Sequence, residues 1–328
     1  MTWITEPFTA AFLLRALVGG VLVAGICGVV GTWVVLRGLA FLGEAMAHGM
    51  LPGVATAALL GLPPVAGAAV SAVVMSAGIS LVSRRGRLSH DTSIGLLFVG
   101  MLALGVIIVS SSRSFATDLT AILFGDILAI RDADLLGLSV ALVVTVLVAI
   151  AFHRPFVALA FDRRVAATMG LRPRLAHAAL VGLVTLAVVA SYSAVGTLLV
   201  VALLLGPAVA AAHWARSIPL IMLLATGFGA FAVLLGLLIS WYGDTAAGAS
   251  IAACSILLAA ASWAVRSLVA RIRRPASPHL EPSTDPTHLE SAPCTDSPDR
   301  SSEPAPLPAP TIAAAAPRGA HSLSPRSR

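Results

Sequence analysis

Residues 12–36 read FLLRALVGGVLVAGICGVVGTWVVL, an almost unbroken apolar run in which Arg15 is the only charged residue. A helix of this length, rising about 1.5 Å per residue, can cross the roughly 30 Å of hydrocarbon in a bilayer. The rest of the chain has the same character, since 58% of its 328 residues are hydrophobic, 11% are charged, and its mean hydropathy is +0.95. An ordinary soluble domain carries about 25% charged residues. The sequence therefore excludes a soluble globular protein and predicts an all-α polytopic membrane protein.

Apolar runs of similar length recur as far as residue 265, so we expect eight to nine transmembrane helices. The candidate runs are residues 12–36, 39–60, 65–82, 94–110, 135–152, 175–192, 195–212, 218–240 and 246–265. Between the fourth and fifth runs, residues 115–130 are moderately apolar but contain Asp118, Gly125 and Asp126. This segment predicts a short re-entrant helix that lines a cavity. Asp118 and Asp126 could attract a cation there, although capping a helix or a loop near the surface explains them equally well.

The basic residues bear on three questions: ATP binding, nucleic-acid binding and orientation in the membrane. None of the 21 is lysine, so the phosphate-binding motif GxxxxGK[ST] is absent and this chain cannot itself be a P-loop ATPase. The formal net charge is +6, but the arginines lie in loops between apolar runs and do not predict a nucleic-acid surface. Because cytoplasmic loops are enriched in arginine, their distribution predicts an N-terminus outside the cell and a C-terminus inside.

The composition changes abruptly near residue 274. Residues 1–274 form the predicted transmembrane domain, whereas residues 275–328 are rich in Pro, Ser and Ala and have few large apolar side chains. Such a segment cannot bury enough apolar surface to offset the entropy of folding. We therefore expect residues 275–328 to be a disordered cytoplasmic tail.

Residues 39–60, LAFLGEAMAHGMLPGVATAALL, place a carboxylate and an imidazole inside an apolar run. Glu44 and His48 are four residues apart and share one face of a helix. Ionisable residues at this depth are costly and usually face a cavity or a transport path. A carboxylate and an imidazole suit zinc, manganese or iron, although the two side chains could also simply pair with each other. Pro52 and Gly53 predict a kink directly after the pair.

The chain resembles the permease subunits of ATP-binding-cassette (ABC) importers for zinc, manganese and iron. The resemblance is carried by GTWVVLRGLAFLGEAMAHGMLPGVA, DTSIGLLF, LFGDIL, AFDRRVAATMGL, SAVGTLLVVALLLGPAVAAA and GLLISWYGDTAAGA, which follow one another in the family's order across residues 12–265. It implies the type II importer permease fold. From the residues themselves, a break of the seventh run at Pro207 would suit close packing around a translocation path, although packing of helices alone explains this residue about as well.

The resemblance also implies roles for particular residues. Permeases of this family usually carry Asp and His where this chain has Glu44 and His48, so these two residues inherit a metal-handling role, with a carboxylate that is one methylene longer. The pattern FDxxxAxxxG marks the helix that contacts the ATPase. In this chain the matching residues are Phe161, Asp162, Ala166 and Gly170.

The resulting hypothesis is a plasma-membrane permease that imports zinc, manganese or iron and is not itself an enzyme. ATP would be hydrolysed by a cytoplasmic partner subunit, an extracellular solute-binding protein would deliver the metal, and a second permease copy would complete the path. We expect no permanently bound cofactor and no nucleic-acid partner. The alternative is an ion-coupled secondary metal transporter, which would have no need of an ATPase-docking helix. A membrane-embedded zinc hydrolase is disfavoured because the chain contains no HExxH motif.

Overall fold

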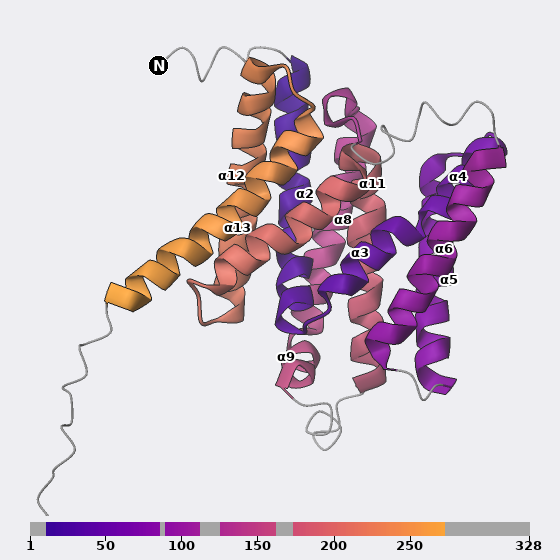
Figure 1. Cartoon of the computed structure of the whole chain (residues 1–328), viewed down its shortest axis with the longest axis horizontal. Helices are drawn as coiled ribbons and strands as arrows, with labels where there is room; N and C mark the ends of the chain where they lie inside the picture. Colours follow the sequence, from indigo (N-terminus) through magenta and orange to yellow (C-terminus); the bar gives the residue numbers. More distant parts are fainter. Residues whose placement is uncertain (1–10, 86–88, 112–124, 162–172, 273–328) are drawn as a thin grey trace, which may run out of the picture. The chain divides into compact units, whose positions relative to one another are not determined.

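The structure is a computed structural model that describes residues 11–85, 89–111, 125–161 and 173–272. Within these ranges the chain is almost entirely helical (Figure 1). Its elements are α2 (Ala11–Leu36), α3 (Ala40–Gly49), α4 (Leu51–Leu59), α5 (Pro64–Arg85), α6 (His90–Ser111), the 3-10 turn η3 (Ile127–Ala129), α8 (Asp132–Ala151), α9 (His153–Phe161), α11 (Pro173–Ala212), α12 (Ile218–Gly243) and α13 (Ala247–Ile272).

Eight helical segments of the described chain are long and apolar enough to cross a membrane. They include both halves of α11, Leu175–Tyr192 and Ala194–Ala212, which match the sixth and seventh predicted runs. The predicted run 39–60 also forms helix, but it is divided into α3 and α4, each too short to span alone. The prediction of an all-α polytopic membrane protein with eight to nine transmembrane helices is confirmed.

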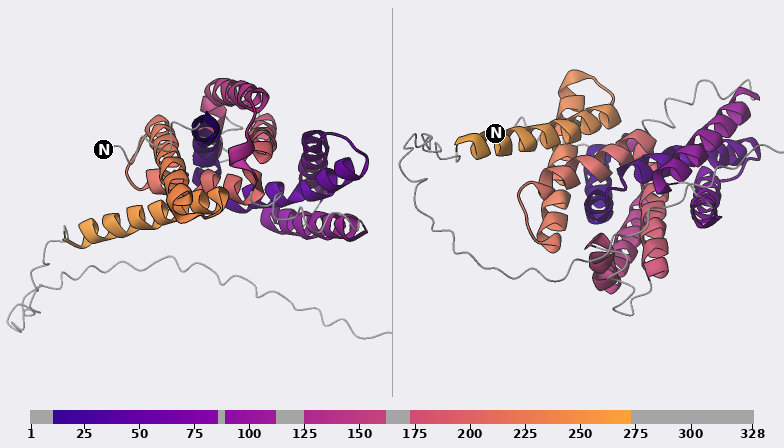
Figure 2. Two further views of the ribbon diagram at one scale, coloured as in Figure 1. Left: turned by 90° about the horizontal axis from the view of Figure 1, so that it is seen from above. Right: turned by 60° about the horizontal axis from the view of Figure 1, so that its bottom comes forward.

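Helix α2 lies at the centre of the bundle, where it packs against α8, α11 and α12 (Figures 1 and 2). Helices α3 to α6 pack on one another as a second group. Small residues allow the close approach of α2 to its neighbours, because a Cβ at Gly31 would overlap the carbonyl of Leu204 and one at Gly28 would press on the backbone of Thr226. Membrane helices commonly associate in this way, since lipid supplies no hydrophobic drive between them.

A change of backbone direction divides α11 at Gly196, where φ is 72° and ψ is 170°. Only glycine adopts such a conformation without strain. The loop before η3 lies against this break, because a Cβ at Gly125 would touch the peptide between Val195 and Gly196. Gly125 itself has a φ of 65°. Two glycines from distant parts of the sequence therefore meet where α11 is broken.

The predicted break at Pro207 is wrong. The helix continues through this residue, and the non-helical backbone lies at Gly196. A proline inside a membrane helix is tolerated when neighbouring helices supply hydrogen bonds to the carbonyls nearby. The hydroxyl of Ser255 in α13 donates to the carbonyl of Ala202 at 2.9 Å, whereas the carbonyl that loses its donor to Pro207 is that of Leu203. Helix α13 therefore packs on this part of α11, and α11 continues through Pro207.

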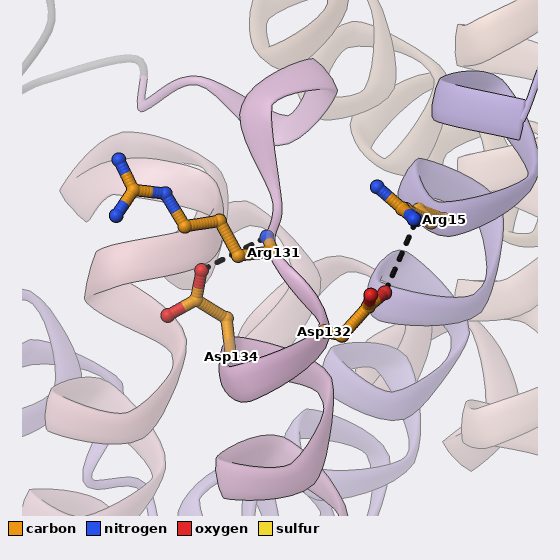
Figure 3. A network of polar contacts seen from close by, with 4 residues as sticks. All are labelled: Arg15, Arg131, Asp132 and Asp134. Carbon is orange, nitrogen blue, oxygen red and sulfur yellow. Dashed lines mark hydrogen bonds and ion pairs between the residues drawn. The ribbon is translucent and has the colours of Figure 1, made fainter.

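Charged residues cluster where α2 and α8 begin (Figure 3). Arg15 Nε lies 3.1 Å from Asp132 Oδ1, and the Asp134 carboxylate accepts a hydrogen bond from the backbone N–H of Arg131 at 3.0 Å. Both acids lie in the first turn of α8, where carboxylates complement the helix dipole. Because these side chains are exposed, the ion pair contributes little stability and mainly fixes how α8 begins.

Of the predicted re-entrant segment, only residues 125–130 lie in the described chain, and they contain the single 3-10 turn η3. Asp118 lies outside the described residues. Residues 275–328, predicted to be a disordered tail, lie outside them as well.

Candidate metal site

Glu44 and His48 lie on one face of α3, as their spacing predicts. His48 Nε2 is 3.7 Å from Glu44 Oε1, a contact slightly longer than a hydrogen bond. The His48 side chain is 21% exposed and the Glu44 side chain 49%, whereas Ala45, Met46 and Ala47 are buried on the other face. Neither side chain is sealed in the core of this chain.

An aromatic ring of α6, that of Phe98, packs beside this pair. The Phe98 ring lies 5.9 Å from the His48 ring and 5.7 Å from the Phe41 ring, measured between centroids. The contact restricts the orientation of the imidazole on one side while Glu44 approaches it on the same helix. Nothing local in the sequence indicates this contact, because Phe98 lies 50 residues beyond His48.

The break between α3 and α4 lies directly after His48 and follows from Pro52. Proline has no backbone N–H, so the carbonyl of His48 loses the donor that an unbroken helix would place four residues later. The N–H of Met50 turns to this carbonyl instead. On α5, the Ser71 hydroxyl donates to the carbonyl of Gly49 at 2.8 Å. The kink predicted from Pro52 and Gly53 is therefore present, one turn from the candidate ligands.

Helix α5 holds the broken helix closely. Gly53 of α4 and Gly67 of α5 face each other so tightly that a Cβ on either would overlap the other's backbone carbonyl. Next to them, Met75 packs on Gly49, where a Cβ would collide with the thioether sulfur. The break is thus clamped by backbone contact on the side away from Glu44.

Polar atoms line the buried side of α3, and sequence reasoning missed them. The Ser76 hydroxyl of α5 lies 3.8 Å from the Met46 sulfur and 3.0 Å from the Thr185 hydroxyl of α11. These contacts join α3, α5 and α11 at the level of the candidate site. Serine and threonine spaced this far apart in the sequence carry no pattern that would have found them.

The other predicted site residues do not gather around the pair. Asp126 is exposed and precedes η3, which packs against α2, α11 and α13, whereas α3 packs against α5, α6 and α11. Phe161 is the last residue of α9, and Asp162, Ala166 and Gly170 lie outside the described residues. In the part of the chain that the structure describes, no three His, Cys, Asp or Glu side chains lie close enough together to hold one metal ion.

As metal ligands, Glu44 and His48 of one chain would make an open, incomplete coordination shell. A structural zinc site is closed by four ligands, whereas a transport site must release its ion and cannot hold it so firmly. Glu44 and His48 beside a helix break are chemically suited to brief coordination of a divalent transition metal ion.

Comparison with known proteins agrees with this architecture. The model of the ABC 3 transport family matches residues 9–266. Similar relatives include the manganese transport system membrane protein MntC of Listeria innocua, 38% identical over 240 residues, which are 73% of this chain and 85% of the relative. The probable iron transport system membrane protein of Haemophilus influenzae is 30% identical over 271 residues, covering 83% of this chain and 98% of the relative.

Among solved structures, a chain of PsaBC from Streptococcus pneumoniae in complex with Fab is similar, with a TM-score of 0.71 and 34% identity. The match covers 80% of this chain and 94% of that one. The resemblance to metal-importer permeases is therefore confirmed over the whole helical bundle. The chain belongs to the ABC 3 transport family and is a multi-pass membrane permease of the metal-ion ABC importers.

Proposed function

We propose that this permease carries a divalent transition metal ion into the cell past Glu44 and His48, driven by ATP hydrolysed in a partner subunit. The observation that carries the proposal is the position of the pair on a partly exposed face of α3, directly before a broken and clamped turn. Transporter sites are commonly built at interrupted helices, where freed carbonyls and side chains can bind an ion and release it again.

Manganese and iron are the favoured ions. The names of the similar relatives refer to manganese and iron transport, and an imidazole with a carboxylate accepts either. Zinc binds the same donor types, so it belongs in the same experiment. Selectivity between these ions depends on geometry and ligand number more than on the order of affinity.

The path requires partners. A second copy of the permease would bring a second Glu44 and His48 pair to the pathway and complete the coordination shell. An extracellular solute-binding protein would deliver the ion, and the ATPase would dock on Phe161, Asp162, Ala166 and Gly170. Asp118 and Asp126 would attract the cation on its way. This arrangement puts residues 275–328 on the cytoplasmic side of the plasma membrane, as the arginine-rich loops favour.

The test is uptake of radioactive manganese, iron and zinc in cells that lack this chain, complemented with wild type, His48→Ala or Asp162→Arg at matched membrane abundance. We expect wild type to restore uptake of one of the metals and both variants to abolish it. His213→Ala is the matched control, because this histidine, directly after α11, bonds the Val209 carbonyl at 2.7 Å and its loss should leave uptake intact.

The outcomes separate the candidate functions. Loss of uptake in His48→Ala with full uptake in Asp162→Arg would favour an ion-coupled secondary transporter. Wild type that restores uptake of none of the three metals would overturn the proposed substrate class.

A further inference from the structure

The end of α13, residues 263–272, lies apart from the other helices (Figures 1 and 2). Ser262 is the last buried residue of this helix. Its hydroxyl donates to the carbonyl of Ala210 in α11 at 3.0 Å and accepts a hydrogen bond from the indole N–H of Trp214 at 2.7 Å. None of residues 263–272 is buried. Helix α13 is therefore fixed to α11 at Ser262 and continues beyond this point without cover from the described chain.

The α13 end, as we call residues 263–272, has two chemically different faces. Four exposed apolar side chains with the spacing i, i+3, i+4 and i+7 form one face, and they are Val265, Leu268, Val269 and Ile272. Arg266 and Arg271 are exposed on the other side of the helix. A helix with one apolar and one basic face suits the boundary between the hydrocarbon of a membrane and its head groups.

Two tryptophans lie where the α13 end leaves the bundle. Trp263 is the first residue of the α13 end, and Trp214 is joined to the preceding residue, Ser262, by its indole N–H. The two residues are 62% and 49% exposed. Indole rings are enriched at the surface of a membrane, because the ring is apolar and its N–H is polar. Their position indicates that the α13 end begins near the membrane surface.

The arginines in this region have no acidic partner in the described chain. Arg216 follows Trp214 by two residues and is exposed, like Arg266 and Arg271. None of these three arginines forms an ion pair with a residue that the structure describes. The sequence adds arginines at 273 and 274, and residues 245–280 contain no Asp or Glu. Anions from outside α13 must therefore balance this positive charge.

We propose that the α13 end, together with Arg216, binds the head groups of anionic phospholipids. The lipid phosphate complements the unpaired guanidinium groups, while the apolar face of the α13 end lies against the acyl chains. Basic clusters directly after a membrane helix attract anionic lipids, and each arginine near the surface strengthens the attraction. An acidic protein would balance the charge but would leave the apolar face uncovered. This binding is separate from the proposed metal path and does not depend on it.

The test is the melting temperature of the full chain in neutral detergent micelles to which phosphatidylglycerol is added in steps. We expect phosphatidylglycerol to raise the melting temperature, because a ligand of the folded protein stabilises it, and phosphatidylcholine to raise it less. Arg266→Gln and Arg271→Gln should each need about fivefold more phosphatidylglycerol for half of the maximal rise, and the double variant more than about tenfold. High salt should weaken the response of the wild type.

Two control variants separate lipid binding from a general effect of charge. Arg15→Gln with Arg131→Gln removes two exposed arginines where α2 and α8 begin, and there Arg15 already pairs with Asp132 (Figure 3). This control should keep the wild-type response to phosphatidylglycerol. Arg266→Lys with Arg271→Lys keeps both positive charges and should retain most of the response. Glycerol phosphate at the same phosphate concentration should not raise the melting temperature, because it has no acyl chains.

Equal responses of the wild type to phosphatidylglycerol and phosphatidylcholine overturn the proposal, as does an unchanged response in the Arg266→Gln, Arg271→Gln double variant. A rise with glycerol phosphate as large as that with the lipid would assign the arginines to a soluble anion and not to the membrane. A double variant that keeps the lipid response but no longer binds a second copy or the ATPase would assign this surface to a protein and likewise overturn the proposal. If the double variant does not accumulate, each single variant gives the same decision.

Discussion

At the scale of single residues, the carboxylate of Glu44 is where this chain departs from the Asp and His pattern of the permeases it resembles. Its longer side chain still reaches His48, with 3.7 Å between Oε1 and Nε2. The extra methylene moves the oxygens outward along the exposed face of α3. Compared with an aspartate at this position, Glu44 therefore keeps the negative charge but places its carboxylate farther from the axis of α3.

This gives a prediction for the carboxylate. Glu44→Gln keeps the shape of the side chain and removes its charge, so manganese uptake should fall at least about tenfold. Even residues that only hydrogen-bond to metal ligands contribute about 10- to 100-fold in metal affinity or activity. Glu44→Asp keeps the charge and should retain uptake with an altered ratio of manganese to zinc. Radioactive uptake at matched abundance measures both, and wild-type uptake in Glu44→Gln would remove Glu44 from the path.

A second prediction concerns the hydrogen bond beside the helix break. Ser71→Ala leaves the buried carbonyl of Gly49 without its donor at 2.8 Å, and should lower the free energy of unfolding by about 1–3 kcal/mol. The control is Ser110→Ala, whose exposed hydroxyl bonds the Ile107 carbonyl of its own helix, and which should change stability by less than about 0.5 kcal/mol. Thermal unfolding in detergent compares the two, and equal melting temperatures would contradict this role for Ser71.

At the scale of elements, the pairing of α4 with α5 depends on a lack of side chains. Gly53→Ala places a methyl group against the Gly67 carbonyl, and should destabilise the protein by about 1–3 kcal/mol because neither backbone can give way easily. Gly137→Ala is the matched control, since a Cβ there meets nothing within 4 Å and alanine favours helix. Melting temperature and membrane abundance are the measurements. A Gly53→Ala protein as stable as wild type would mean that the two helices are not clamped.

The same elements show which features the sequence could predict. Each span was found because lipid demands a continuous apolar run, and the α3–α4 break was found because Pro52 removes a donor locally. The break in α11 is predicted at Pro207 but lies at Gly196, where Gly125 from the loop before η3 packs against the backbone. This contact comes from a residue distant in the sequence.

The candidate site likewise has one part that the sequence predicts and another that it does not. The spacing of Glu44 and His48 predicted their shared face, since four residues make about one helical turn. Phe98 of α6 lies beside His48, and Ser71 and Met75 of α5 contact the neighbouring Gly49, but nothing local in the sequence links these residues to the pair. Sequence thus predicts ligands that lie on one helix, whereas their surroundings require the fold.

At the scale of the whole molecule, the helical bundle accounts for the family match at residues 9–266, and residues 275–328 lie beyond it. We predict that deleting residues 275–328 leaves metal uptake within about twofold of wild type, because a segment so poor in large apolar residues contributes little to a packed core. Uptake and membrane abundance of the truncated chain are the measurements. Loss of uptake at normal abundance would assign the segment a role in transport.

We propose above that this permease moves a transition metal past Glu44 and His48 at the expense of ATP. The most direct measurement is manganese accumulation in proteoliposomes containing the permease, its ATPase and the solute-binding protein, with ATP or a non-hydrolysable analogue supplied on the ATPase side. We expect accumulation with ATP but not with the analogue, and loss of accumulation in the Glu44→Ala and His48→Ala variants while the ATPase remains bound. Accumulation that proceeds equally with the analogue, or that survives both substitutions, would contradict it.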